Sequence, residues 1–193
     1  MSTLDYGQPL GGITQIAYVV EDLDAAMSEF TALMKVGPWF VTGPFVPAAG
    51  VYRGEPTQMK ITLAVAFSGH VMLELIQQHD TLPSVYREKI EKSGYGFHHY
   101  AVPTRDFEAE ITRYQRMGYE LAFSDISPRG SRIAYMDSSR AVHGMIELVE
   151  MSDRLEAIYT GFYHASVGWD GKDPVRRTAV CSPAAAAVTP RTA

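Results

Sequence analysis

Cysteine is almost absent from this chain of 193 residues, since the only one, Cys181, lies near the C-terminus. A single cysteine excludes an internal disulfide, and it excludes metal sites that need several thiolate ligands. Any bound metal must therefore be held by oxygen and nitrogen ligands. The fold has to be stabilised by a hydrophobic core, for which a chain of this length is sufficient.

Long apolar runs and basic stripes are missing as well. No run approaches the roughly 20 residues that span a bilayer, and the N-terminus has no signal-peptide pattern. The net charge of −5 comes from interspersed charges of both signs, which disfavours nucleic-acid binding. Neither a phosphate-binding loop nor a G-x-S-x-G motif occurs. These absences predict a cytoplasmic protein that binds a small molecule, with no nucleic acid or membrane partner.

One acidic residue interrupts an otherwise apolar segment. The stretch HVMLELIQQ, residues 70–78, is typical of a buried β-strand, yet it contains Glu74. Burying an ionised carboxylate without a partner costs on the order of several kcal/mol, so the group must be protonated, paired with a cation or bound to a metal. The same pattern returns in HGMIELVE, residues 143–150, with Glu147 in the matching position. The matched strands indicate an internal repeat.

The repeat extends upstream of both strands. The segments GITQIAYVVEDLDAAMSEFTALM, from Gly12, and GFHHYAVPTRDFEAEITRYQRMG, from Gly96, each begin with an alternating apolar run and continue as an amphipathic helix. Two further strands precede the acidic strand in each half. The sequence therefore predicts an α+β protein with two βαβββ modules, residues 12–79 and 96–151.

The remaining segments are assigned by composition. Residues 1–11 form an N-terminal arm, and residues 80–95 form a linker that contains a short helix. Residues 152–176 are predicted to be a helix followed by a turn, and residues 177–193, rich in Ala, Pro and Thr, a disordered tail. The first module has a longer loop, residues 43–57, where a specificity-determining insertion is expected.

Four polar side chains occupy equivalent positions of the repeat. Gln15 in the first strand matches His99 in the first strand of the second module, and Glu74 matches Glu147. A pseudo-twofold relation between the modules would bring all four to one central point. Carboxylate, amide and imidazole ligands suit a divalent ion, and four protein ligands leave open positions for substrate if the site is octahedral.

Neighbouring residues have simpler interpretations. Because strand side chains alternate, Phe97 is expected to share a face with His99, while His98 points to the opposite face as a core residue. His70 and His143 lie about 13 Å along the strand from the glutamates, too far to share a metal with them. Three arginines in or beside the variable loops are interpreted first as solvated side chains, with an anionic substrate as the alternative: Arg53, Arg129 and Arg132.

These segments resemble the vicinal oxygen chelate superfamily over roughly residues 12–151. The matching positions are Gln15 in TQIAYVV, Glu74 in LELI, His99 in HHYAV and Glu147 in IELVE. The resemblance implies that the two modules form a cupped mixed sheet around one divalent ion per chain, either Co, Ni, Mn, Zn or Fe, bound by these four residues. It also implies a homodimer.

The resemblance leaves several activities open. The order Gln, Glu, His, Glu is similar to glyoxalase I, whereas the linker and the segment SRIAYMDSSRAVHGMIELVE resemble methylmalonyl-CoA epimerase, whose first ligand is usually His. The leading prediction is an isomerase or epimerase that acts on a small carbonyl compound, such as an acyl-CoA or another oxo acid derivative, through a metal-stabilised enolate. Glu147 would be the catalytic base, and Glu74 a ligand or second base.

Three alternatives remain at this stage. The first is a glyoxalase I-like lyase that acts on a thiol hemithioacetal. A dioxygenase is disfavoured because those enzymes prefer two histidines and one carboxylate. The third is a non-catalytic ligand-binding protein of the bleomycin-resistance type.

Overall fold

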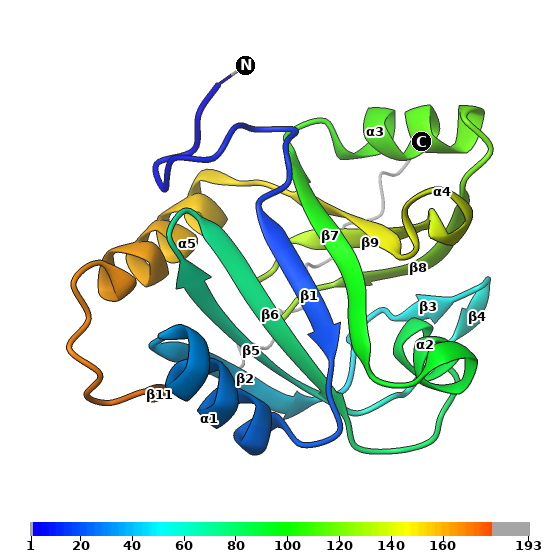
Figure 1. Ribbon diagram of the computed structural model, residues 1–193. Coiled ribbons are helices and arrows are strands. Elements are labelled where there is room, and N and C mark those ends of the chain that lie inside the picture. Colours follow the sequence, from blue (N-terminus) through cyan, green and yellow to red (C-terminus); the bar gives the residue numbers. More distant parts are fainter. Residues whose placement is uncertain (1, 179–193) are drawn as a thin grey trace, which may run out of the picture.

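A single mixed sheet forms the centre of the structure, a computed structural model that describes residues 2–178 (Figure 1). The first half contains β1 (Gln15–Val19), α1 (Leu23–Met34), β2 (Trp39–Phe45), β3 (Val51–Tyr52), β4 (Glu55–Pro56), β5 (Ile61–Ser68) and β6 (Val71–Gln78). The second half contains α2 (Val85–Ser93), β7 (Gly96–Thr104), α3 (Phe107–Arg116), β8 (Glu120–Ile126), β9 (Arg132–Asp137), α4 (Ser139–Val142), β10 (Met145–Glu150), α5 (Asp153–Ser166) and β11 (Val175–Thr178).

The strand order confirms the repeat. Across the sheet the strands follow the order β11-β2-β5-β6-β1-β7-β10-β9-β8-β3-β4. Each module therefore arranges its first, fourth, third and second strands side by side, and the first strand is parallel to the fourth in both modules. The two first strands, β1 and β7, pair antiparallel at the centre (Figure 1). The predicted α+β fold with two βαβββ modules is confirmed.

Local sequence explains where the helices begin. Asp22, Ser84, Asp106 and Ser152 each precede a helix, and their side chains accept a hydrogen bond from a backbone N–H of the first turn. Such caps satisfy donors that have no partner inside the helix. The helices predicted in the linker and after the second module are confirmed as α2 and α5.

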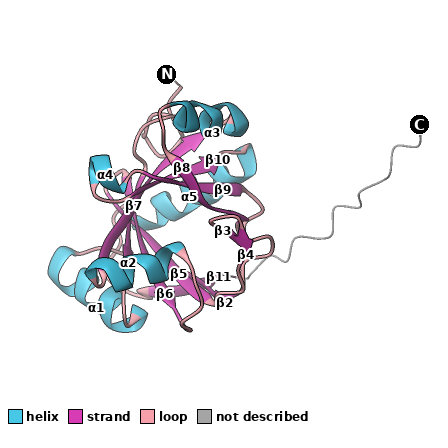
Figure 2. Cartoon of the chain, turned by 90° about the vertical axis from the view of Figure 1, so that its right-hand side faces the viewer, coloured by secondary structure: helices cyan, strands magenta, loops and turns pink. Residues whose placement is uncertain are grey.

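Alternation along the strands separates an outer and an inner face of the sheet. On β6, Leu75 packs outward in a cluster with Met27 of α1, and on β10 Leu148 packs outward with Phe107 of α3. In Figure 2 these two helices lie at opposite ends of the molecule, each over its own module. Met72 belongs to a different cluster on the inner face, which α5 covers.

Two apolar clusters on the inner face flank the acidic positions. Ile76 and Met145 belong to one, together with side chains of α2, whereas Met72 and Val149 belong to the other, together with side chains of α5. Both clusters contain residues of both modules. The inner face is therefore continuous and apolar, apart from a polar centre between the two clusters.

The long loop of the first module crosses to the second module. Its strands β3 and β4 form a hairpin that pairs with β8. The two residues of the hairpin turn, Arg53 and Gly54, have positive φ angles of 46° and 90°, as the tight turn favoured in hairpins requires. This pairing holds the inserted loop beside the pocket described below.

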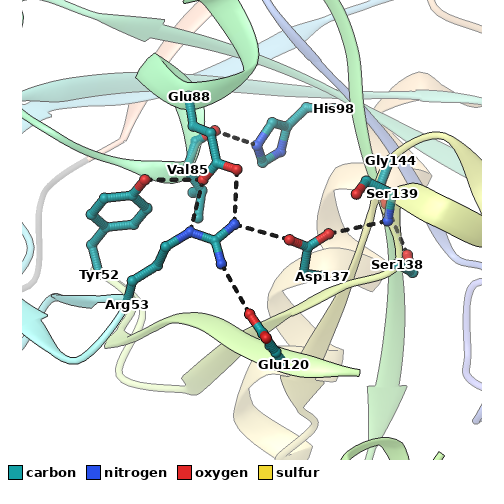
Figure 3. A network of polar contacts seen from close by, with 10 residues as sticks. All are labelled: Tyr52, Arg53, Val85, Glu88, His98, Glu120, Asp137, Ser138, Ser139 and Gly144. Atoms are coloured by element: carbon teal, nitrogen blue, oxygen red, sulfur yellow. Dashed lines mark hydrogen bonds and ion pairs between the residues drawn. The ribbon is translucent and has the colours of Figure 1, made fainter. Parts of the chain in front are cut away.

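Arg53 fixes the hairpin to its surroundings (Figure 3). Its Nη2 lies 2.8 Å from Glu88 of α2 and 2.9 Å from Asp137 of β9. We expect Arg53→Ala to speed amide hydrogen exchange in residues 51–56 and to lower stability by about 1 kcal/mol, because these pairs are only partly shielded from water. The matched control is Arg113→Ala, which removes a more exposed pair within α3. Wild-type exchange rates in the hairpin of Arg53→Ala would contradict this role.

The end of the described chain differs from the sequence prediction. A turn up to residue 176 and a disordered tail from residue 177 were expected, but Arg177 and Thr178 belong to β11, which pairs parallel to β2. The strand was missed because Val175–Thr178 is short and mostly polar, and it forms by pairing with a distant edge. The rest of the expected tail lies outside the described residues. Among residues 2–178, no helix has the length and apolar character needed to cross a bilayer.

Candidate metal centre

The register of the four central strands brings the predicted residues together. Ala17 pairs with Glu74 on one side and with His99 on the other. Ala101 likewise pairs with Gln15 and with Glu147. Directly paired residues point to the same face of a sheet, so the four polar side chains surround two alanines that are fully buried. The small methyl groups leave room for the longer polar side chains to converge.

The distances among the polar atoms are short. His99 Nε2 lies 3.2 Å from Glu147 Oε2 and 3.5 Å from Glu74 Oε2. Gln15 Nε2 lies 2.9 Å from Glu74 Oε2 and 3.3 Å from His99 Nε2. One ligand atom from each of Glu74, His99 and Glu147 lies within 4.8 Å of the other two. Ligands about 2.1 Å from a single ion are separated by roughly 3 to 4 Å, so these separations match a shared ion.

Burial makes the group costly without a cation. Glu74, His99, Glu147 and Gln15 are all buried. Removal from water raises the pKa of Glu147 to about 8, and it raises the pKa of Glu74 well above its usual value, with a further increase from the nearby charge of Glu147. Burial also lowers the pKa of His99 to about 3. Without a cation, the Glu147 carboxyl group therefore holds a proton at neutral pH and His99 is neutral, while burial also favours the protonated form of Glu74.

The donor set fits a divalent ion. Two carboxylates and a neutral imidazole are ligands of the Mn, Fe, Co, Ni and Zn class, and two carboxylate charges balance one divalent charge. Gln15 directs its Nε2 group toward Glu74 and His99. A half-turn of the amide would present its oxygen as a fourth ligand.

The expected position of His98 is wrong. The pairing of β7 with β1 shifts between Ala17 and Tyr18, so that His99 pairs with Ala17, Phe97 pairs with Tyr18, and His98 is skipped. A β-bulge of this kind breaks the alternation of side chains. The His98 ring consequently lies 5.6 Å from that of Tyr135 on the inner face, and Phe97 packs against Tyr18 and Tyr100 instead of sharing a face with His99.

The bulge connects His98 to the candidate ligand His99. His98 Nε2 lies 3.2 Å from the Val85 carbonyl oxygen, which can only accept a hydrogen bond, so His98 carries its proton on Nε2 (Figure 3). His98 Nδ1 then accepts a hydrogen bond from His99 Nδ1, 2.9 Å away. His99 is left with a lone pair on Nε2, the atom that faces both glutamates. The Val85 carbonyl group of α2 thereby fixes, through His98, the tautomer of His99 that metal binding requires.

Replacement of His98 tests this tautomer control. We expect His98→Phe to weaken Co(II) binding by about 10- to 100-fold, because His99 Nδ1–H loses its acceptor. His98→Asn, whose side-chain oxygen can accept the same hydrogen bond, should retain more affinity. Isothermal titration calorimetry of all three proteins measures the difference. Equal affinities for His98→Phe and the wild type would contradict the assignment.

Three of the four residues open onto a small pocket. Gln15, Glu74 and Glu147 line it, and its free volume is ≈ 40 Å³. The other walls are largely apolar, and they include Phe45, Pro47, Ile61, Leu63, Phe123 and Ile133. His70 and His143 are absent from the metal-ligand group found among the described residues, as the sequence predicted. Phe45 and Pro47 come from the first part of the long loop, consistent with a specificity role for that loop.

Two tyrosines at the site were not predicted. Tyr135 of β9 forms a hydrogen bond with Glu147 that partly opposes the rise in that residue's pKa. The Tyr86 hydroxyl of α2 lies 3.1 Å from the Tyr135 hydroxyl. With Tyr135 donating to Glu147, Tyr86 donates to Tyr135. The alternation of side chains in the strand SRIAYMD could have suggested Tyr135. The position of Tyr86, however, depends on how α2 packs against the sheet.

Comparisons with known proteins identify the family. The family model of the glyoxalase/bleomycin resistance protein/dioxygenase superfamily matches residues 14–135, which include three of the four predicted metal ligands. No curated protein sequence matches the chain.

Several solved structures share the fold. Hypothetical protein BH1468 from Bacillus halodurans C-125 has a TM-score of 0.58 and 18% identity, covering 74% of this chain and 95% of its own. Methylmalonyl-CoA epimerase from Mycobacterium tuberculosis has a TM-score of 0.54 and 20% identity, covering 81% of this chain and 95% of its own. A variant of the Streptomyces coelicolor methylmalonyl-CoA epimerase, in complex with 2-nitronate-propionyl-CoA, has a TM-score of 0.52 and 20% identity. The match covers 73% of this chain and 97% of that protein.

At these identities, the structural neighbours establish a common architecture and do not assign an activity. The family match covers most of the chain, and the two modules repeat one strand order within a single mixed sheet. This chain is therefore a member of the glyoxalase/bleomycin resistance protein/dioxygenase superfamily, as the sequence resemblance predicted.

Proposed function

We propose that the protein is a divalent-metal-dependent isomerase or epimerase that acts on a small carbonyl compound. The observation that carries the proposal is the pair of buried glutamates, Glu74 and Glu147, whose Oε2 atoms lie 3.5 and 3.2 Å from His99 Nε2. A divalent ion bound there would supply a Lewis acid that stabilises the enolate formed when a carbon beside the carbonyl loses its proton. Gln15, Glu74, His99 and Glu147 are the proposed ligands.

Glu147 is the proposed base. Tyr135 forms a hydrogen bond with its carboxyl group and orients it toward the pocket. Exclusion of water strengthens the basicity of a carboxylate, because its charged form is less well solvated. Glu74 occupies the pseudo-symmetric position and is hydrogen-bonded by Gln15. An epimerase must move protons on two faces of one carbon, and a symmetric pair of carboxyl groups suits that requirement.

Solvent isotope exchange tests the proposal. The metal-loaded protein is incubated in D₂O with each enantiomer of methylmalonyl-CoA, chosen because a structural neighbour binds it, and with other chiral 2-substituted thioesters and oxo acids. We expect deuterium to enter the carbon beside the carbonyl of at least one substrate, together with racemisation. Absence of exchange in every chiral carbonyl compound would contradict an isomerase or epimerase.

A glyoxalase I-like lyase is the second candidate. The order of Gln15, Glu74, His99 and Glu147 favours it, since this order resembles glyoxalase I. Turnover of a hemithioacetal formed from glutathione and a 2-oxoaldehyde, without racemisation of the thioesters, would replace the epimerase with the lyase. Both candidates use the same proton chemistry at the same residues.

A further inference from the structure

Arg129 lies in a rigid turn at the edge of the pocket. The turn joins β8 to β9, with Pro128 before Arg129 and a hydrogen bond from Gly130 N–H to the Ser127 carbonyl. A second backbone hydrogen bond, from Ser127 N–H to the Ser131 carbonyl, closes the base of the turn. Proline fixes its own φ angle, and Gly130 supplies the positive φ of 85° that follows. The backbone that carries Arg129 is therefore well defined.

The arginine side chain reaches from the second module to the first. Its Nη2 donates to Thr42 Oγ1 of β2 at 3.0 Å, and the guanidinium lies 5.5 Å from the ring centre of Phe162 on α5. Thr178 of β11 supports Thr42: the two hydroxyl oxygens lie 2.7 Å apart, and the Thr178 hydroxyl donates to the Val41 carbonyl. With these donors assigned, Thr42 donates to Thr178 and accepts from Arg129. The guanidinium is thus held by one hydrogen bond and one aromatic ring.

Arg129 forms no ion pair within the described part of the chain. Arg53, Arg105, Arg113 and Arg132 all form ion pairs with carboxylates, whereas none is found for Arg129 among residues 2–178. Yet Arg129 lines the same pocket as Glu74, and its positive charge opposes the rise in that residue's pKa. Its one hydrogen bond in this part of the chain involves Nη2, although a guanidinium has five N–H donors.

The other charged group on the pocket wall already has partners. Asp125 Oδ1 accepts a hydrogen bond from Ala49 N–H at 2.9 Å, and Asp125 is buried. The rest of the wall away from the glutamates is mostly apolar. The pocket wall thus carries two kinds of polar group, the candidate ligands Gln15, Glu74 and Glu147 and the guanidinium of Arg129. The pocket's free volume of ≈ 40 Å³ corresponds to about three water molecules, so the part of a ligand that contacts both groups must be small.

We propose that Arg129 binds a carboxylate of the substrate, attached close to the carbon that loses its proton. This inference rests on the proposed function and restricts its substrate class to small carbonyl compounds with a free carboxylate. Planar guanidinium groups bind carboxylates through two parallel hydrogen bonds, and the interaction is strengthened where water is excluded. Arg129 is in this view a specificity-determining residue, and it takes no part in the proton transfer.

Two hydroxamates that differ by one carboxylate test the proposal. Acetohydroxamate and the monohydroxamate of malonic acid offer a metal the same pair of vicinal oxygens, and only the second carries a carboxylate. Their affinities for the Co(II)-loaded protein are measured from the visible Co(II) spectrum. We expect the wild type to bind the malonic derivative at least about tenfold more tightly, as a charge-assisted carboxylate pair would allow.

Variants separate recognition from a structural role. Arg129→Gln should abolish the preference while leaving acetohydroxamate affinity within about twofold, and Arg129→Lys should keep part of the preference. Thr42→Val, which removes the hydroxyl that accepts from Arg129 and donates to Thr178, should reduce the preference without removing it. These variants allow the test even if Arg129→Gln folds poorly.

The possible results distinguish the two proposals. A preference that survives in Arg129→Gln, or an equal loss of affinity for both hydroxamates, would overturn the role of Arg129 and leave the metal centre standing. Equal affinity of the wild type for the two hydroxamates would also overturn the role of Arg129 and leave the metal centre standing. If the wild type binds neither Co(II) nor the two hydroxamates, the proposed function fails, and the carboxylate assignment fails with it.

Discussion

Glu147→Gln is expected to lower the rate of solvent deuterium exchange into the substrate by about 10²- to 10⁴-fold, the usual contribution of a general base. Glutamine keeps the size and one oxygen of the side chain but cannot accept the proton. Glu147 is buried and is hydrogen-bonded by Tyr135, so its carboxylate is the group positioned to accept the proton. The rate must be divided by the amount of bound metal in each variant, because Glu147 is also a proposed ligand.

Glu74→Gln provides the matched comparison. In a two-base epimerase each carboxylate removes the proton from one enantiomer, so the two variants should lose exchange with opposite enantiomers. Both variants should lose racemisation. Exchange in Glu147→Gln within about threefold of the wild type, with both enantiomers, would remove Glu147 from the mechanism and leave Glu74 as the remaining candidate base.

The metal-free protein is expected to lose stability as the pH rises from 6.5 to 8. Burial raises the pKa of Glu147 from 4.5 to about 8, so the folded protein holds a proton that the unfolded chain has already released. Folding then becomes less favourable with rising pH, by on the order of 2 kcal/mol over this interval. The lowered pKa of His99 makes stability increase with pH, but this effect is confined to pH values below the ordinary histidine pKa of 6.5.

Chemical denaturation at several pH values measures this dependence. Metal-loaded protein should not lose stability in the same interval, because the ion takes the place of the proton and binds the ionised carboxylates. Metal-free Glu147→Gln should show a weaker dependence than the metal-free wild type. A metal-free wild type whose stability is constant or increases between pH 6.5 and 8 would contradict the proposed environment of the glutamates.

Strand patterns predicted most of the central architecture. A carboxylate among aliphatic residues is recognisable in any sequence because its burial is costly, and its recurrence in HVMLELIQ and HGMIELVE revealed the repeat. The repeat then paired Gln15 with His99 by position. The structure brings these two residues together with Glu74 and Glu147, at the distances described above.

Features that depend on pairing between distant segments could not be predicted in this way. The bulge at His98 breaks the alternation because of the register between β7 and β1, which no local pattern specifies. The pairing of the β3–β4 hairpin with β8, and of β11 with β2, likewise joins segments far apart in the chain. Arg129 was interpreted first as solvated because the sequence does not show which side of the turn faces the pocket.

Metal content is the most direct test of the central claim. The protein is purified without added metal and without an affinity tag, and bound metals are measured by mass spectrometry beside His99→Ala and the control His143→Ala, since His143 lies outside the candidate ligand group. We predict close to one tightly bound divalent ion per chain in the wild type and in the control, and its loss in His99→Ala. Absence of a bound ion, even after reconstitution with Mn, Co, Ni and Zn, would contradict the account.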